Sequence, residues 1–275
     1  MANMKTVVYR ESYVAFLDVL GFENLVKSDA SESKSKLECY FKLINEEVKE
    51  LKKFAEKRDI GALIISDSVI LSVEKTTSHP KNTQILRQLC IAIKKIQFRL
   101  ALNGLWLRGG VSSGKAYFSP QNNQIVGPAY IDAYNLENRV AIYPRVILDS
   151  RLINELEYNS AEDLITAIND SRDDDILFPW SEDLHRHAGM QKDVALFVDY
   201  LATSFAKIDD LTKVIDNIEE AIYEDNQVYS KYRWVTEYLL SKCLQVQERH
   251  SMFQSQRGEK ELQNIHKQSV RLKKF

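Results

Sequence analysis

The chain has 275 residues, and its 37 lysines and arginines nearly balance its 39 aspartates and glutamates, for a net charge of -2. Such a balance gives no overall field that would attract nucleic acid or anionic lipid. The three cysteines are odd in number and far apart, and the first residues lack the charged and apolar regions of a signal peptide. No apolar run approaches the roughly 20 residues that a membrane helix needs, so we expect a soluble cytoplasmic protein.

The first predicted element is a buried strand that runs into a tight turn. Residues 13–17 are apolar and include β-formers, and Gly21 breaks the run. Asp18 places one carboxylate at the end of this apolar strand. Burying an unpaired charge costs several kcal/mol, so Asp18 requires a metal ion, a cation or several N–H donors. An ordinary turn-capping aspartate is the alternative interpretation.

A helix and a hairpin follow. Apolar residues three or four apart predict an amphipathic helix over residues 37–54. Two short apolar runs, 60–65 and 69–73, then flank Ser66-Asp67-Ser68, a pattern typical of a hairpin with a carboxylate at its tip. Taken alone, Asp67 is also explained as a turn residue.

The remaining predicted elements complete the first half of the chain. Asn82 is a suitable cap for a helix that ends before Gly104. Residues 106–118 predict a strand, a small-residue turn and a second strand, and a hairpin, a helix over 130–141 and a strand over 145–149 come next. The order β-α-β-β-α-β-β-α-β predicts an α+β fold of the ferredoxin-like split βαβ type, with helices on one face of an antiparallel or mixed sheet.

Beyond residue 150 the sequence becomes mainly helical. Apolar periodicity predicts helices over 193–201, 208–223 and 229–247, and the charged tail from residue 248 predicts a frayed or partner-packed helix. We expect residues 151–275 to form a helical C-terminal extension that packs on the first part or on a dimer partner.

The two aspartates gain meaning together, because the first strand and the hairpin lie side by side in a split βαβ sheet. Two aspartates at that point could hold two divalent cations, Mn²⁺ or Mg²⁺, on a nucleoside triphosphate whose phosphates supply the remaining oxygens. The turn after the first strand would present backbone N–H groups to the phosphates from Leu20, Gly21 and Phe22.

These residues resemble the class III nucleotidyl cyclases. Phe16 to Phe22 is similar to the family's Phe-x-Asp-x-x-Gly-Phe metal motif, and Ser66-Asp67-Ser68 falls at its Gly-Asp hairpin. The segment 108–114 resembles its Arg-x-Gly-Ile-x-x-Gly strand, and 127–137 resembles its dimerisation and transition-state helix. The resemblance implies that residues 10–150 form a nucleotidyl cyclase catalytic domain and that a homodimer carries the active sites at its interface.

The resemblance also implies individual roles. It places Lys115 at a basic phosphate-binding position. The family's transition-state asparagine and arginine fall at Ile131 and Asn135, so Asn135 is the catalytic candidate and an arginine is missing where it would stabilise developing charge. The residues implied to bind the metal ions are Asp18, Val19 and Asp67.

At two positions that would bind the nucleotide base, the sequence departs from the family pattern. Purine cyclases read the base from positions occupied here by Leu63 and Gln124. Leu63 cannot hydrogen-bond a purine edge, whereas the Gln124 amide can both donate and accept toward uracil or cytosine. The pattern is similar to the bacterial pyrimidine cyclases of the Pycsar anti-phage system, which implies UTP, or alternatively CTP, as substrate. It further implies a cyclic product that acts on a separate cyclic-nucleotide-binding effector, with no nucleic acid or membrane partner.

Two other functions remain open from sequence. A degenerate cyclase fold would bind nucleotide without turnover, which the missing arginine favours and the two aspartates and Lys115 oppose. Another palm-type enzyme would make linear or cyclic dinucleotides, but the Gly-Gly-Asp-Glu-Phe signature of diguanylate cyclases is absent from the sequence.

Overall fold

The computed structural model describes residues 7–54, 60–119, 121–170, 175–179, 196–224, 229–253 and 258–274. The strands are β1 (Arg10–Val19), β2 (Ile60–Ile65), β3 (Ser68–Glu74), β4 (Leu107–Ser119), β5 (Gln124–Val126), β6 (Val146–Leu148) and β7 (Leu196–Phe197). The helices of the first half are α1 (Phe22–Lys27), α2 (Ser31–Phe54), α3 (His79–Ala101) and α4 (Pro128–Arg139). Those of the second half are α5 (Arg151–Glu155), α6 (Ala161–Asn169), the 3₁₀ helix η1 (Leu201–Ala206), α8 (Ile208–Glu224), α9 (Tyr229–Phe253) and α10 (Glu259–Leu272).

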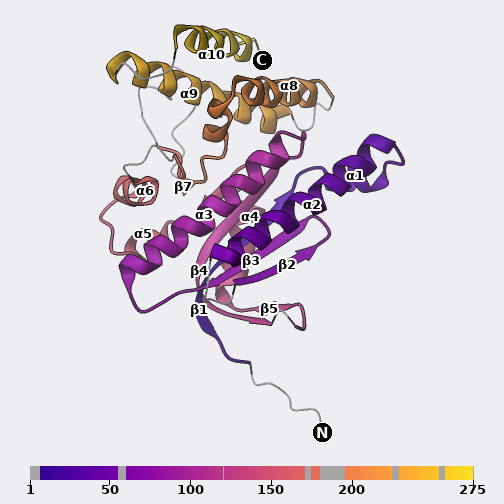
Figure 1. Ribbon diagram of the computed structural model, residues 1–275. Coiled ribbons are helices and arrows are strands. Elements are labelled where there is room, and N and C mark those ends of the chain that lie inside the picture. The colour runs from indigo at the N-terminus through magenta and orange to yellow at the C-terminus, as the bar shows by residue number, and fades with distance from the viewer. Residues whose placement is uncertain are drawn as a thin grey trace.

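The sheet has the strand order β2-β3-β1-β4-β6-β7 (Figure 1). β1 is antiparallel to both β3 and β4, and β4 pairs in parallel with β6. The first four strands of this order, joined by α2 and α3, form the ferredoxin-like split βαβ arrangement. The predicted α+β fold class is therefore confirmed.

The helices cover both faces of this sheet, so the prediction of helices on one face was wrong. α2 and α3 pack on the face that carries Tyr13 and Leu17, whereas α4 packs on the opposite face against Val14 and Phe16. The close approach of α4 requires glycine at position 110. A Cβ at Gly110 would lie 2.5 Å from the backbone oxygen of Ala133 on α4.

Three local predictions differ from the structure. β4 is one continuous strand whose ladder with β1 runs unbroken from Arg10 to Val19, so the small-residue segment makes no turn. α3 begins at His79 after Ser78, and Asn82 instead hydrogen-bonds Thr76 from within the helix. The predicted helix over 193–201 lies partly outside the described residues, and its described part forms β7 and the start of η1.

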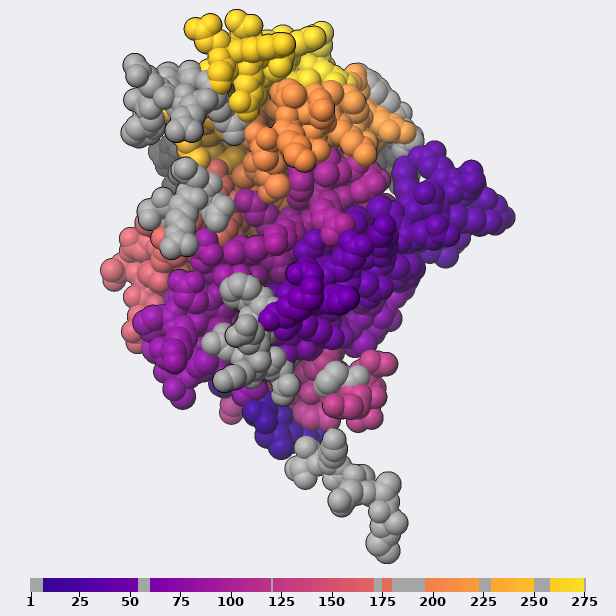
Figure 2. Space-filling model, viewed as in Figure 1, coloured from indigo at the N-terminus to yellow at the C-terminus, as the bar shows by residue number. Residues whose placement is uncertain are grey.

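The C-terminal helices form a second core at one end of the molecule, next to α3 (Figure 2). α8 and α9 confirm two of the predicted helices, and α9 continues beyond the predicted end. α10 packs on α8 and α9 of its own chain. None of the helices in the described part of the chain has the length and apolarity required to span a bilayer.

Candidate active site

The end of β1 and the β2–β3 turn place the two predicted aspartates together. Asp18 is the last-but-one residue of β1 and lies opposite Ser68 on β3 and Arg108 on β4. Asp67 occupies the tight turn between β2 and β3, where Ser66 adopts a left-handed conformation with φ of 57°. The Val19 N–H donates to the backbone oxygen of Asp67 at 3.2 Å, so the turn is tied to the end of β1.

The two carboxylates interact directly. Burial raises the pKa of Asp18 above its usual 3.8, Arg108 opposes this shift, and the charge of Asp67 and its hydrogen-bonding contact with Asp18 raise the pKa further. A neighbouring like charge disfavours the ionised form of Asp18, and a bound cation would relieve this repulsion. The structure therefore brings together the two residues that the sequence predicts as metal ligands.

Two further charged residues join this pair, and neither was given a role from the sequence. The Nε of Arg108 lies 3.3 Å from Oδ2 of Asp18 and 2.8 Å from Oε1 of Glu137 on α4. Burial raises the pKa of Glu137, Arg108 lowers it, and Asp18 and Asp67 raise it. A sequence signal for Glu137 exists, because it follows Ala129 and Ala133 at helical spacing and so falls on the buried side of α4.

Tyr40 of α2 approaches the same charges from the other side of the sheet. Its side chain is fully buried, and its hydroxyl has no hydrogen-bond partner within the described part of the chain. Burial, and then the charges of Asp67 and Asp18, raise the pKa of Tyr40. The hydroxyl of Tyr40 therefore remains protonated in this buried position.

The chemistry of these donors fits a divalent cation. Asp18, Asp67 and Glu137 carry three negative charges when ionised, against one positive charge on Arg108, so the cluster lacks two positive charges. Carboxylate oxygens are the ligands that Mg²⁺ and Mn²⁺ prefer. Across the described residues, no group of three or more His, Cys, Asp or Glu side chains is placed to hold a metal ion, so Asp18 and Asp67 would need oxygens from a ligand. Val19, whose side chain is apolar and buried, would contribute only its backbone oxygen.

The predicted phosphate-binding amides follow β1 directly. The Leu20 N–H donates to the backbone oxygen of Trp106 at 2.8 Å, so this amide is already engaged. Gly21 is left-handed with φ of 73° and precedes α1, and Phe22 is buried with its ring 5.4 Å from that of Tyr40. The turn at Gly21 therefore lies beside the two aspartates, and the Leu20 amide is not free to bind a phosphate.

Of the predicted base-reading residues, Leu63 lies in an apolar cluster on the α4 side of the sheet, and Gln124 lies outside this cluster. Leu63 on β2 is buried there with Phe16 and Ile70, two positions along the sheet from Asp18 and Ser68. Ile125 on β5 packs against the same cluster, and the neighbouring Gln124 is exposed.

Lys115 is not brought to the two aspartates within one chain. It lies opposite Glu11 on the β1–β4 ladder, seven positions along β4 from Arg108. At about 3.3 Å per residue this corresponds to about 23 Å, and side-chain alternation places Lys115 and Asp18 on opposite faces. Asn135 is half-buried on α4.

No family model and no curated protein matches this sequence. Among solved structures, the chain is similar to the adenylyl cyclase CyaB from P. aeruginosa, with 16% identity, a TM-score of 0.40, and coverage of 70% of this chain and 94% of that chain. Two structures of a bacterial light-regulated adenylyl cyclase show 16% and 18% identity, with TM-scores of 0.40 and 0.39. Each match covers 56% of this chain. The matched part makes up 47% of the first of these two structures' chains and 45% of the second. Likenesses this distant carry no argument about activity.

Apolar side chains are exposed on the same side of the sheet as the site. On the outer surface of α4, Ile131 and Tyr134 are 54% and 42% exposed, and the ring of Tyr134 also contacts Phe16. At the β2–β3 turn, Ile65 is 55% exposed. We refer to Ile65, Ile131 and Tyr134 as the α4-side apolar surface.

Proposed function

We propose that this chain is a nucleotide cyclase that converts a pyrimidine triphosphate, UTP or alternatively CTP, into its 3′,5′-cyclic monophosphate and pyrophosphate. In this reaction the ribose 3′-oxygen bonds to the α-phosphorus, the bond from that phosphorus to the bridging oxygen of the β-phosphate breaks, and the hydroxyl proton passes to solvent. The chain's own residues would bind the triphosphate and orient the hydroxyl for in-line attack.

The observation that carries this proposal is the contact between Asp18 and Asp67. The end of β1 and the β2–β3 turn are distant in sequence, but the Val19 N–H bond to the Asp67 backbone oxygen at 3.2 Å ties them together and places the two aspartates next to each other, with Arg108 paired to Asp18. Ions bound by Asp18, Asp67 and the Val19 backbone would supply charge neutralisation for the phosphates and a lower pKa for the 3′-hydroxyl. Arg108, which pairs with Asp18, would provide a further positive charge for a bound triphosphate.

The pyrimidine preference is supported by the polarity of the predicted base positions. The side chain of Leu63 is apolar and buried, so it offers no hydrogen bond to a purine edge. Gln124 is exposed next to Ile125, which packs on the cluster that contains Leu63. Without a polar side chain at position 63, the site cannot favour purines over pyrimidines by hydrogen bonding there. The Gln124 amide can still pair with uracil or cytosine.

A homodimer would complete the site. Lys115 lies on the opposite sheet face from Asp18 within one chain, so it would reach the triphosphate only from a second copy. The α4-side apolar surface, next to the partly exposed Asn135, supports pairing at this position. The family resemblance further supports a cytoplasmic signalling role in bacterial antiviral defence, with a separate effector that binds the product.

A nucleotide-binding module without turnover is the second candidate. Asn135 stands where the resembling family has an arginine, so one source of positive charge for the transition state is missing. Such a module would bind the triphosphate at the same aspartates and release it unchanged.

One experiment separates these functions. The purified protein is incubated with Mn²⁺ and equal concentrations of ATP, GTP, CTP and UTP, and the products are resolved by mass spectrometry. We expect cyclic UMP as the main product, with no cyclic product from Asp18→Asn or Asp67→Asn, and unchanged activity in the exposed control Asp29→Asn. Cyclic AMP or cyclic GMP as the main product would refute the pyrimidine preference, and nucleotide binding without any product would favour the module.

A further inference from the structure

One N–H group in the site faces two carboxylates. The Nε–H of Arg108 donates to Oδ2 of Asp18 at 3.3 Å, while Oε1 of Glu137 lies closer, at 2.8 Å from the same nitrogen. The contact with Glu137 is an ion pair without hydrogen-bond geometry. Oε1 of Glu137 is therefore buried without a hydrogen-bond partner in the described structure. A single N–H bonds one acceptor well at a time. Asp18 and Glu137 therefore compete for the Nε–H of Arg108.

The two competitors differ in how firmly they are held. The side chain of Glu137 is 4% exposed and extends from the buried side of α4, which Gly110 allows to lie close to the sheet. The side chain of Asp18 is 18% exposed at the end of β1 and also contacts Asp67. A buried carboxylate deprived of its cation is strongly destabilised. Glu137 therefore needs the positive charge of Arg108 whether or not a metal ion is bound. Asp18 can instead be neutralised by a bound cation.

We propose that Glu137 is a positioning residue that draws the Arg108 guanidinium away from Asp18 and so leaves Asp18 available to a divalent cation. This inference rests on the metal site of the proposed function. Because coupling between two binding equilibria is reciprocal, a cation on Asp18 also strengthens the pairing of Arg108 with Glu137. Without Glu137, Arg108 pairs with Asp18 alone and competes with the cation.

The test measures Mn²⁺ binding to the full chain without nucleotide, by electron paramagnetic resonance of the free ion. Glu137→Gln keeps the shape of the side chain but removes its charge, and we expect the Mn²⁺ dissociation constant to rise by about tenfold, within the usual range of such couplings. Arg108→Gln/Glu137→Gln removes the competitor as well, so its dissociation constant returns to the wild-type value or below. The matched control is Asp132→Asn on the same helix, whose carboxylate pairs with Arg151, and it should bind Mn²⁺ as the wild type does.

The double variant distinguishes positioning from a general structural role. If Glu137 only stabilised the fold, the double variant would bind Mn²⁺ as poorly as Glu137→Gln, and that result would overturn the inference. Glu137→Gln within twofold of wild type, or no saturable Mn²⁺ binding that Asp18→Asn removes, would also overturn it. Circular dichroism and thermal unfolding of each variant verify that it is folded. Cyclic nucleotide production is scored separately, so the predicted binding pattern without product would refute the proposed catalysis and support this inference.

Discussion

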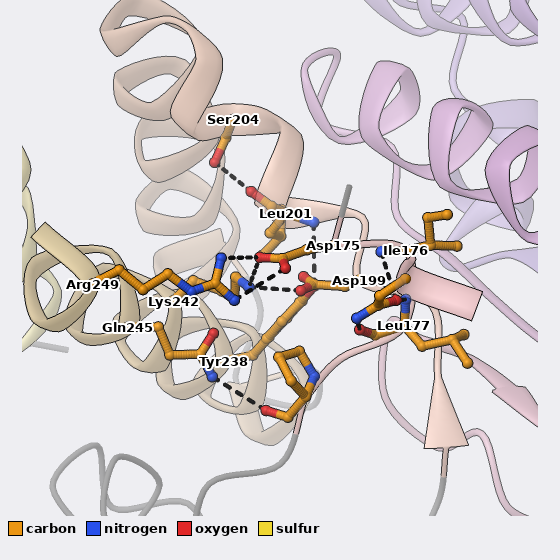
Figure 3. Close-up of polar contacts among 12 residues, drawn as sticks. Asp175, Ile176, Leu177, Asp199, Leu201, Ser204, Tyr238, Lys242, Gln245 and Arg249 are labelled. Carbon is orange, nitrogen blue, oxygen red and sulfur yellow. Dashed lines mark hydrogen bonds and ion pairs between the residues drawn. The ribbon is translucent and has the colours of Figure 1, made fainter. Parts of the chain in front are cut away.

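The buried ion-pair network that joins Asp175 and Asp199 to Lys242 on α9 provides the sharpest stability prediction (Figure 3). The Lys242 ammonium lies 2.7 Å from Oδ2 of Asp199 and 2.8 Å from Oδ2 of Asp175. The side chains of Lys242 and Asp199 are 1% and 0% exposed. The Tyr238 hydroxyl donates to Asp199, and Arg249 pairs with Asp175 nearer the surface.

Lys242→Met removes the positive charge and keeps most of the aliphatic stem. Asp199 then retains the Tyr238 hydroxyl but loses its only ion pair in the described structure, while Asp175 keeps Arg249. Removing one partner of a buried ion pair costs about 3–5 kcal/mol, and we expect a loss in this range because Asp199 is fully enclosed. Lys242→Met/Asp199→Asn removes both charges and should lose less than the single variant.

The loss should depend on pH through Asp175. Burial alone would raise its pKa, but Lys242 and Arg249 outweigh burial, so the pKa lies below its usual 3.8. A carboxylate with a lowered folded-state pKa contributes stability that is complete above the unfolded-state pKa and is lost as the pH falls through the folded-state value. The advantage of wild type over Lys242→Met should therefore be full at neutral pH and shrink below about pH 4.

The assay is urea unfolding followed by tryptophan fluorescence, since Trp106 and Trp234 both lie in the second core. The control is Lys213→Met, which removes an exposed lysine from α8 and should change the free energy of unfolding by less than about 0.5 kcal/mol. A loss below about 1 kcal/mol for Lys242→Met at pH 7 would refute the reasoning, because it would mean that Asp199 is satisfied without the lysine.

Three further predictions concern the site. Lys115→Ala should raise KM for every accepted triphosphate similarly in steady-state assays, because a lysine acts on phosphate as a point charge, and a change in base preference would contradict this role. Gly110→Ala should displace α4, since the new Cβ would lie 2.5 Å from the Ala133 oxygen, and should lower the unfolding midpoint by more than Gly258→Ala, where nothing lies within 4 Å and φ is −67°. Tyr134→Ser should shift the protein toward monomer in analytical ultracentrifugation while Val270→Ser on α10 does not, and an unchanged dimer would exclude the α4-side apolar surface as the interface.

The order of the strands was predictable because it depends on signals that are local in sequence. Periodicities of two and of three to four residues mark the strands and helices up to residue 150, and a β-α-β-β-α-β order has few sheet topologies available. The position of α4 was not predictable in the same way. Whether a third helix joins the other two or takes the opposite face depends on where a helix backbone can approach the sheet, and here Gly110 permits the approach of α4.

Some residues of the site could likewise be predicted from the sequence, and others could not. Asp18 and Asp67 stand out from sequence because each interrupts an apolar run, and topology then implies that they meet. Glu137 does not interrupt a strand, and its role depends on the length and direction of the Arg108 side chain across the β4–α4 contact. Lys115 shows the converse, because its sequence position suggests phosphate binding whereas the β1–β4 register places it on the other face.

The C-terminal helices reach the candidate site through the residues that follow β1. Leu20, two positions after Asp18, packs against the second core, and its amide is bound by the Trp106 oxygen. The Trp106 ring is buried in that core and contacts the ring of Tyr232 on α9, with centroids 5.8 Å apart. The contact between Tyr232 and Trp106 therefore links α9 to the backbone at Leu20. Arg108 pairs with the Asp18 side chain, and the second core packs against Leu20, two residues further along the chain. The C-terminal helices therefore help to fix the backbone that carries Asp18.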